Sequence, residues 1–187
     1  MLSVRKILDL AGMKIVDVTL NDINGGSFAV TACKDTNKEF PTNTTVIDWL
    51  IEEEYKMGLD TLTPYIHWAE RTNAHRDSLV NLIRGLKNEG KSVYGYGAST
   101  KGNAMLQWCG LTSDDITAFG EINPDKYGCV TPGTNIPIIP ESDVKAAHPD
   151  YMVVLPWHFR HGILQREKEY RKGGGKFIFP LPHIEIV

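Results

Sequence analysis

Cysteine is scarce and unpaired in this sequence of 187 residues. Cys33, Cys109 and Cys129 lie far apart, and no two of them form a C-x-x-C pair. Isolated thiols in odd number exclude a disulfide framework and argue against a structural zinc site, so no metal centre is expected. They are typical of a reducing compartment, and we expect a cytoplasmic protein.

Long apolar runs and clusters of basic residues are missing as well. No apolar stretch approaches the roughly 20 residues that span a bilayer. No signal peptide is expected, since Met1 leads directly into "LSVRKILDLAG". The net charge is −3, and no predicted face gathers lysine and arginine. Membranes and nucleic acids are therefore not expected as partners.

The second half of the chain alternates short apolar strands with helices. Strands are predicted over residues 92–97, 116–121, 136–140, 151–156 and 176–182. Helices are predicted between them, over residues 99–110, 141–147 and 161–174. This alternation indicates a parallel sheet covered by helices on both faces. We therefore predict an α/β fold with a mostly parallel sheet.

The first half has a different pattern. A helix over residues 3–12 precedes two strands that the turn "INGG" joins into a hairpin, 14–22 and 27–34. In the first strand Val16, Val18 and Leu20 are expected to share one face. Helices are predicted over residues 44–57 and 61–89.

These patterns divide the chain into three expected segments. They are a terminal helix and hairpin over residues 1–35, a linker with helices over 36–90, and the α/β domain over 91–187. A lone hairpin cannot bury its apolar face, so self-association through residues 1–35 is expected.

The loop "GYGASTKGN" follows the first strand of the α/β domain and opens a helix. Glycines allow tight backbone geometry, small polar side chains offer hydrogen bonds, and the helix N-terminus with a lysine favours an anion such as a diphosphate. A tight strand-to-helix turn with an exposed lysine is the equally weighted alternative. The candidate binding residues here are Gly97, Ser99, Thr100, Lys101, Gly102 and Asn103.

Two further strand ends carry candidate residues. Glu121 stands where dinucleotide-binding folds keep an acid for ribose hydroxyls, although a surface glutamate beside a turn is the commoner case. Asn123 and Lys126 are expected to be turn or solvent residues. The fourth strand is followed by an aromatic platform and groups that suit a phosphate-bearing ligand, namely Trp157, His158, Phe159 and Arg160. The alternative places Trp157 and Phe159 in the core and His158 near the N-cap of the next helix.

Long runs of the sequence resemble a known family. "YGYGASTKGNAMLQWCGL", "EINPDKYGCVTPGTNIPI" and "PDYMVVLPWHFRHGILQREKEYRKGGGKFIFPLPHIEI" are similar to the C-terminal domain of SAM-dependent sugar C-methyltransferases. The upstream run "AGMKIVDVTLNDINGGSFAVTACK" resembles the closing helix and last hairpin of the same family's methyltransferase domain. These enzymes add a methyl carbon to a nucleotide-linked keto-deoxysugar, typically a dTDP-sugar.

The resemblance implies a Rossmann-like domain that binds the nucleotide sugar. It implies that Ser99, Thr100, Lys101 and Asn103 lie near the diphosphate or sugar, with Trp157, His158 and Arg160 at the rim. The family's zinc cysteines, SAM-binding loop and catalytic base have no counterpart in this sequence, so no catalytic residue is expected here. S-adenosylmethionine is then the cofactor of the full-length enzyme and is not expected to bind this chain alone.

The main interpretation is that the chain is the substrate-binding part of a methyltransferase whose SAM-binding domain acts in cis. Two alternatives remain open: a freestanding module that works with a separate methyltransferase in trans, and an NAD-binding module. The glycine-rich loop and Glu121 fit the NAD-binding module as well.

Overall fold

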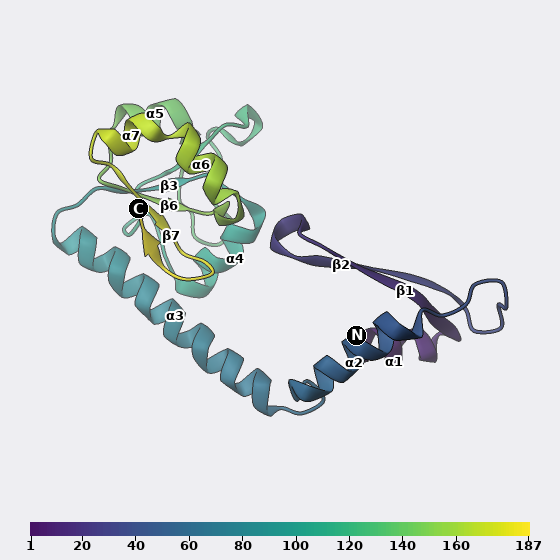
Figure 1. Ribbon diagram of the computed structural model, residues 1–187. Helices are drawn as coiled ribbons and strands as arrows, with labels where there is room; N and C mark the ends of the chain where they lie inside the picture. Colours follow the sequence, from purple (N-terminus) through teal and green to yellow (C-terminus); the bar gives the residue numbers. More distant parts are fainter. The chain divides into compact units, whose positions relative to one another are not determined.

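The structure is a computed structural model that describes residues 1–187, except for the side chain of Asn24. The chain divides into two compact units, residues 1–71 and 72–187. Each unit has an apolar core of its own, and Figure 1 labels most of their helices and strands.

The first unit is a hairpin flanked by helices. Strands β1 (Met13–Asn21) and β2 (Ser27–Lys34) pair antiparallel through the 3₁₀ turn η1 (Ile23–Gly25). Helices α1 (Leu2–Leu10) and α2 (Thr44–Lys56) accompany the hairpin, and the long helix α3 (Thr63–Asn88) begins here. Although α3 has 26 residues, no helix among the described residues is long and apolar enough to cross a membrane.

A bulge in β1 changes which side chains the hairpin buries. The register shifts between Ile15 and Asp17, so the strict alternation is interrupted there. Ile15 and Val18 both reach the core, whereas Leu20 is 64% exposed. The predicted shared face of Val16, Val18 and Leu20 is therefore wrong at the bulge, which falls at Val16, whereas Val18 and Leu20 keep regular alternation.

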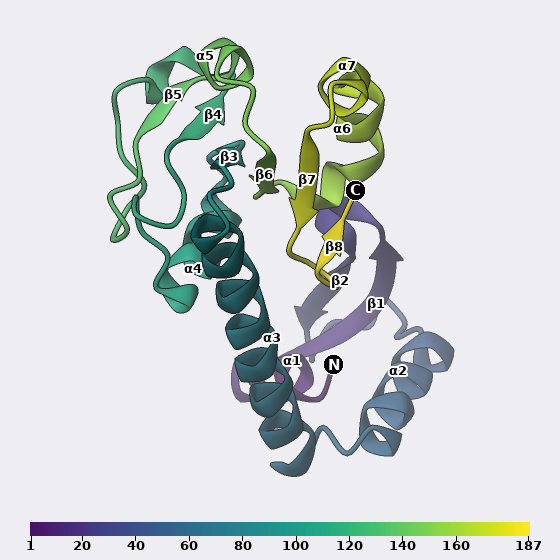
Figure 2. The ribbon, with the colours of Figure 1, turned by 90° about the vertical axis from the view of Figure 1, so that its left-hand side faces the viewer.

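The second unit is built on a six-stranded sheet of order β5-β4-β3-β6-β7-β8, which runs from left to right in Figure 2. All neighbouring strands are parallel except β7 and β8, so the predicted Rossmann-like, mostly parallel fold is confirmed. The strands are β3 (Val93–Tyr96), β4 (Phe119–Glu121), β5 (Ile138–Pro140), β6 (Tyr151–Val154), β7 (Lys176–Phe179) and β8 (Glu185–Ile186).

Helices cover both faces of this sheet. One face packs under α3 and α4 (Thr100–Cys109) through Leu79, Ile83 and Leu106. The other packs under α5 (Glu141–Ala146) and α6 (Arg160–Arg166) through Val144 and Ile163, with α7 (Lys168–Lys172) following. In Figure 1, α5, α6 and α7 lie on one side of the strands and α3 on the other.

The strand order contains a switch point between β3 and β6. From β3 the chain moves outward to β4 and β5, and it then returns to form β6 on the opposite side of β3. The segments that follow β3 and β6 therefore leave the carboxyl ends of these strands in opposite directions. Open parallel sheets leave a crevice for ligands at such a point.

Two predicted elements of this unit need correction. The single helix expected over residues 161–174 is wrong: it is split into α6 and α7 at Glu167, whose backbone leaves the helical conformation with φ −101° and ψ 32°. The carboxylate of Glu167 is drawn into the protein, where it is 4% exposed. The antiparallel strand β8 was not predicted, since two residues give too short a pattern.

Gly102 brings α4 close to the sheet. A Cβ atom at this position would lie 2.5 Å from Cβ of Leu155, whereas Gly85 in α3 has open space around its own Cβ position. We expect Gly102→Ala to destabilise the chain by about 1–3 kcal/mol through overpacking. The matched Gly85→Ala should be neutral or stabilise by up to about 1 kcal/mol, because alanine favours helix. Urea unfolding followed by circular dichroism would measure both, and equal effects would contradict the close approach of α4 to Leu155.

Candidate functional site

A cavity of about 390 Å³ opens at the carboxyl ends of β3 and β4. The segments that wall it are the loop after β3, the turn after β4, the first residue of α5, the segment after β6, and α6. Its lining residues are Tyr96, Gly97, Ser99, Gly120, Glu121, Ile122, Lys126, Glu141, Pro156, Phe159, Gly162, Ile163 and Arg166. The cavity thus occupies the crevice at the switch point, on the face of the sheet that α5 and α6 cover.

The loop after β3 forms one rim of the cavity and starts α4. Gly97 has φ +75°, a conformation that favours glycine, and its Cβ position is only 2.9 Å from the ring of Pro156. Ser99 is the N-cap of α4, and its Oγ accepts a hydrogen bond of 3.1 Å from the amide of Gly102. The first turn of α4 therefore begins at the cavity, with exposed Thr100 and Lys101 on it.

Glu121 holds this loop to the end of β4. Its Oε2 accepts hydrogen bonds from the amide of Ala98 at 3.2 Å and from Nζ of Lys126 at 2.9 Å. Its Oε1 accepts from the amides of Ile122 and Asn123 at 2.8 and 3.1 Å. A carboxylate has about four acceptor positions, so these donors use its hydrogen-bonding capacity.

The surroundings of Glu121 keep it ionised. Burial alone raises the pKa of this carboxyl, but the hydrogen bonds from Lys126 and the two following amides outweigh burial and lower the pKa below its ordinary 4.5. Lys126 also donates to the carbonyl of Ala98 at 3.0 Å. Lys126 lies in the turn after β4, as expected, and its side chain is 41% exposed, but it also binds two groups of the cavity wall.

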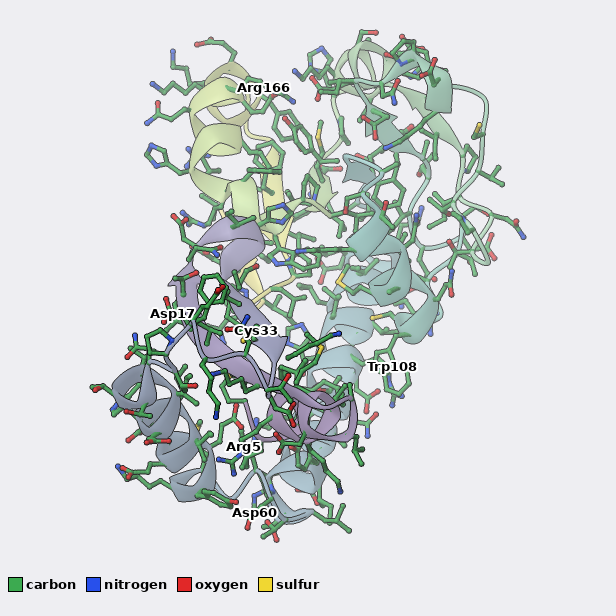
Figure 3. All side chains as sticks on the ribbon, turned by 90° about the vertical axis from the view of Figure 1, so that its right-hand side faces the viewer. Arg5, Asp17, Cys33, Asp60, Trp108 and Arg166 are labelled. Carbon is green, nitrogen blue, oxygen red and sulfur yellow. The ribbon has the colours of Figure 1, made fainter. Side chains whose placement is uncertain are left out.

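A second ionic network forms the opposite wall. Arg166 donates from Nε to Glu167 at 2.8 Å and from Nη2 to the hydroxyl of Tyr96 and to Glu141. Lys145 bridges the two carboxylates, at 2.8 Å from Glu141 and 2.8 Å from Glu167. Figure 3 labels Arg166 on α6. The network joins α5, α6 and β3 around the cavity.

The hydroxyl of Tyr96 is locked inside this network. It donates to Oε1 of Glu167 at 2.9 Å. Burial, followed by the negative charges of Glu141 and Glu167, raises the pKa of Tyr96 far above its ordinary range, so the phenol stays protonated. Burial also opposes ionisation of Glu167, but the hydrogen bonds from Lys145, Tyr96 and Arg166 lower its pKa overall.

In the aromatic segment after β6, Trp157 and Arg160 do not line the cavity, contrary to the expectation that they form its rim. The segment forms the 3₁₀ turn η3 (Trp157–Phe159), in which half-buried Trp157 packs against the core beneath α6. Arg160 lies outside the cavity lining and donates to Glu185 from Nε at 3.0 Å and from Nη2 at 2.6 Å. Its planar fork is therefore occupied by a carboxylate of β8. Phe159, 63% exposed, is the aromatic ring that faces the cavity.

The structure thus gathers only part of the predicted set at the cavity. Gly97, Ser99 and Glu121 line it. The residues outside its lining are Thr100, Lys101, Gly102, Asn103, Trp157, His158 and Arg160. Asn103 Oδ1 and His158 Nδ1 are buried without a hydrogen-bond partner among the described residues.

Several lining residues escaped the sequence analysis. Glu141 and Arg166 stand 25 residues apart and meet only through the packing of α5 against α6. Phe159 belongs to the predicted aromatic platform, but the spacing of the aromatic residues does not show that its ring, and not that of Trp157, faces the cavity. Within the described residues, no three His, Cys, Asp or Glu side chains come together as a metal site.

Comparison with known proteins gives two findings. Residues 22–182 match the family described as C-methyltransferase C-terminal domain. The chain is also similar to the C-methyltransferase NovU of Streptomyces niveus, with 34% identity over 176 residues. That similarity covers 94% of this chain and 41% of NovU, so the chain spans about two fifths of the relative's length.

The wall that Glu121 holds can be tested by Glu121→Gln. The amide cannot accept all four hydrogen bonds, so we expect a destabilisation of about 2 kcal/mol at neutral pH. Since the pKa of Glu121 is lowered from 4.5, its ionised form stabilises the fold above that pH, and this contribution is lost as the pH falls further. The difference between wild type and variant should therefore shrink below pH 4.5 in urea unfolding curves.

The matched control is Glu169→Gln. Its side chain is 85% exposed and paired only with Lys172 on the same helix. We expect an effect below about 0.5 kcal/mol at every pH. A Glu121→Gln effect as small as this, or one that does not vary with pH, would contradict the structural role given to Glu121.

Proposed function

The chain belongs to the family of C-methyltransferase C-terminal domains, as its resemblance predicted, and we propose that it is the substrate-binding part of a SAM-dependent sugar C-methyltransferase. Its ligand is a nucleotide-linked keto-deoxysugar, typically a dTDP-sugar. The observation that carries the proposal is the cavity at the switch point, bordered by the glycine-containing loop and the first turn of α4.

The proposed diphosphate position is the start of α4. Ser99 lines the cavity and caps this helix, and the positive end of the helix dipole favours negative charge. Lys101 lies on the same first turn and adds a full positive charge. The remainder of the nucleotide sugar extends from this point into or across the cavity.

The proposed reaction divides the work between two parts of an enzyme. A base removes the proton next to the keto group of the sugar, and the resulting enolate carbon attacks a methyl group. SAM, when bound to a methyltransferase domain in cis or in trans, supplies that methyl group. The contribution of this chain is to hold the sugar still, because the reacting carbon atoms must be about 3 Å apart.

The NAD-binding alternative is disfavoured by the contacts of Glu121. In dinucleotide-binding folds an acid at this position accepts hydrogen bonds from ribose hydroxyls. Here the carboxylate already accepts from three amides and Lys126. A ribose would have to displace donors that hold the cavity wall together.

Calorimetric titration of the chain with dTDP, NADH and S-adenosylhomocysteine, each alone, tests the proposal. Binding of dTDP only is the expected result. Preference for NADH over dTDP would favour the NAD-binding alternative over the nucleotide-sugar proposal. If none binds, the proposal that this chain holds the nucleotide sugar by itself fails, and formation of a complex with a SAM-binding methyltransferase would then have to restore dTDP binding.

The proposed diphosphate contact predicts a loss on Lys101→Ala. We expect the affinity for dTDP to fall by about 1–3 kcal/mol, as for a lost charge-assisted contact. Arg160→Ala is the control, because Arg160 is paired with Glu185 and lies outside the cavity lining. Calorimetry of both variants compares the two cations directly. A larger loss for Arg160→Ala would move the diphosphate to η3.

A further inference from the structure

Every charged side chain that lines the cavity is already neutralised. Lys126 pairs with Glu121 at 2.9 Å, and Arg166 pairs with Glu141. The lining therefore contains two cations and two carboxylates, each in contact with an opposite charge. An anion placed inside would gain no net attraction and would lose its hydration.

The network behind Arg166 reinforces this balance. Glu141 and Glu167 face Arg166 and Lys145, so the cluster has two negative and two positive groups. If Arg166 turned to bind a phosphate, one cation would remain for two buried carboxylates. A diphosphate inside the cavity would thus leave a net negative cluster, which is costly in a partly buried site.

The rest of the lining is apolar and includes an exposed ring. Ile122, Pro156 and Ile163 form apolar wall, and Phe159 is 63% exposed beside them. Phenylalanine at this exposure presents a face on which a flat, uncharged ring can stack.

Few polar groups in the cavity have hydrogen bonds to offer. The acceptor positions of Glu121 are used, and Lys126 donates to two partners. Arg166 donates from Nε and Nη2, which leaves Nη1 without a partner among the described residues. This supply is small for a hydroxylated sugar but sufficient for the carbonyl edge of a nucleobase.

From these observations we propose that the cavity holds the uncharged nucleoside of the nucleotide sugar, with its base on Phe159, while the diphosphate stays outside at the start of α4. This inference rests on the proposed function and states which part of the substrate, the nucleoside, binds in the cavity. The volume of about 390 Å³ lies near the lower end of small-molecule sites, roughly 300–1,000 Å³, and suits one part of such a ligand. Ser99, which both lines the cavity and caps α4, marks the passage between the two parts.

The test uses thymidine, which has no phosphate, beside dTDP. We expect thymidine to bind the full chain and to compete with dTDP for one site in calorimetric displacement. The affinity for thymidine should be insensitive to salt, and that for dTDP should fall as salt rises, because only dTDP has charges to screen. Lys101→Ala should weaken dTDP and leave thymidine unchanged.

Phe159→Ala identifies the cavity as the nucleoside site. We expect it to weaken thymidine and dTDP alike, each about tenfold, as for a lost stacking contact. Phe40→Ala is the matched control, since Phe40 is 53% exposed and lies outside the cavity lining. Unchanged unfolding curves for both variants show that the fold is retained.

The outcomes separate this inference from the proposed function. If dTDP binds but thymidine does not, or if Phe159→Ala leaves thymidine binding unchanged, the nucleoside position is wrong while the nucleotide-binding role stands. Binding of a hexose 1-phosphate that depends on Phe159 would place the sugar in the cavity instead and overturn the inference. If neither dTDP nor thymidine binds, the proposed function fails for this chain together with the inference.

Discussion

The candidate site depends above all on one carboxylate. Glu121 ends β4, yet it accepts a hydrogen bond from Ala98 in the loop after β3 and from the turn that follows β4. Two segments that the chain separates by more than twenty residues are thus fixed to one another at the switch point. Lys126 closes the arrangement by bonding both to the carboxylate and to the carbonyl of Ala98. This set of contacts fixes the rim of the cavity together with Gly97 and the cap of α4.

The two walls of the cavity follow the same physical rule. Each places a buried carboxylate among donors that outweigh the cost of burial, with Lys126 on one side and Lys145 with Arg166 on the other. Charges paired in this way make a site rigid without giving it a net charge. Under the proposed function, recognition relies on shape, apolar surface and the few remaining donors, and the start of α4 attracts the phosphate.

The sequence alone was sufficient for the fold and for part of the site. Apolar runs at regular intervals predicted the parallel sheet, and the loop with Gly97 and Ser99 predicted where a helix starts beside the cavity. The remaining lining residues depend on tertiary contacts that no local pattern contains: Arg166 meets Tyr96 across 70 residues of chain. The division of the last helix has the same origin, because the buried contacts of Glu167 override the helical periodicity around it.

The course of α3 has a consequence for engineering. The boundary between the two compact units falls after Arg71, in the middle of this continuous 26-residue helix. A hybrid protein that exchanged only residues 72–187 would have to splice two unrelated half-helices in register. A junction in residues 57–62, ahead of Thr63, keeps the helix whole and transfers it together with the sheet against which its second half packs.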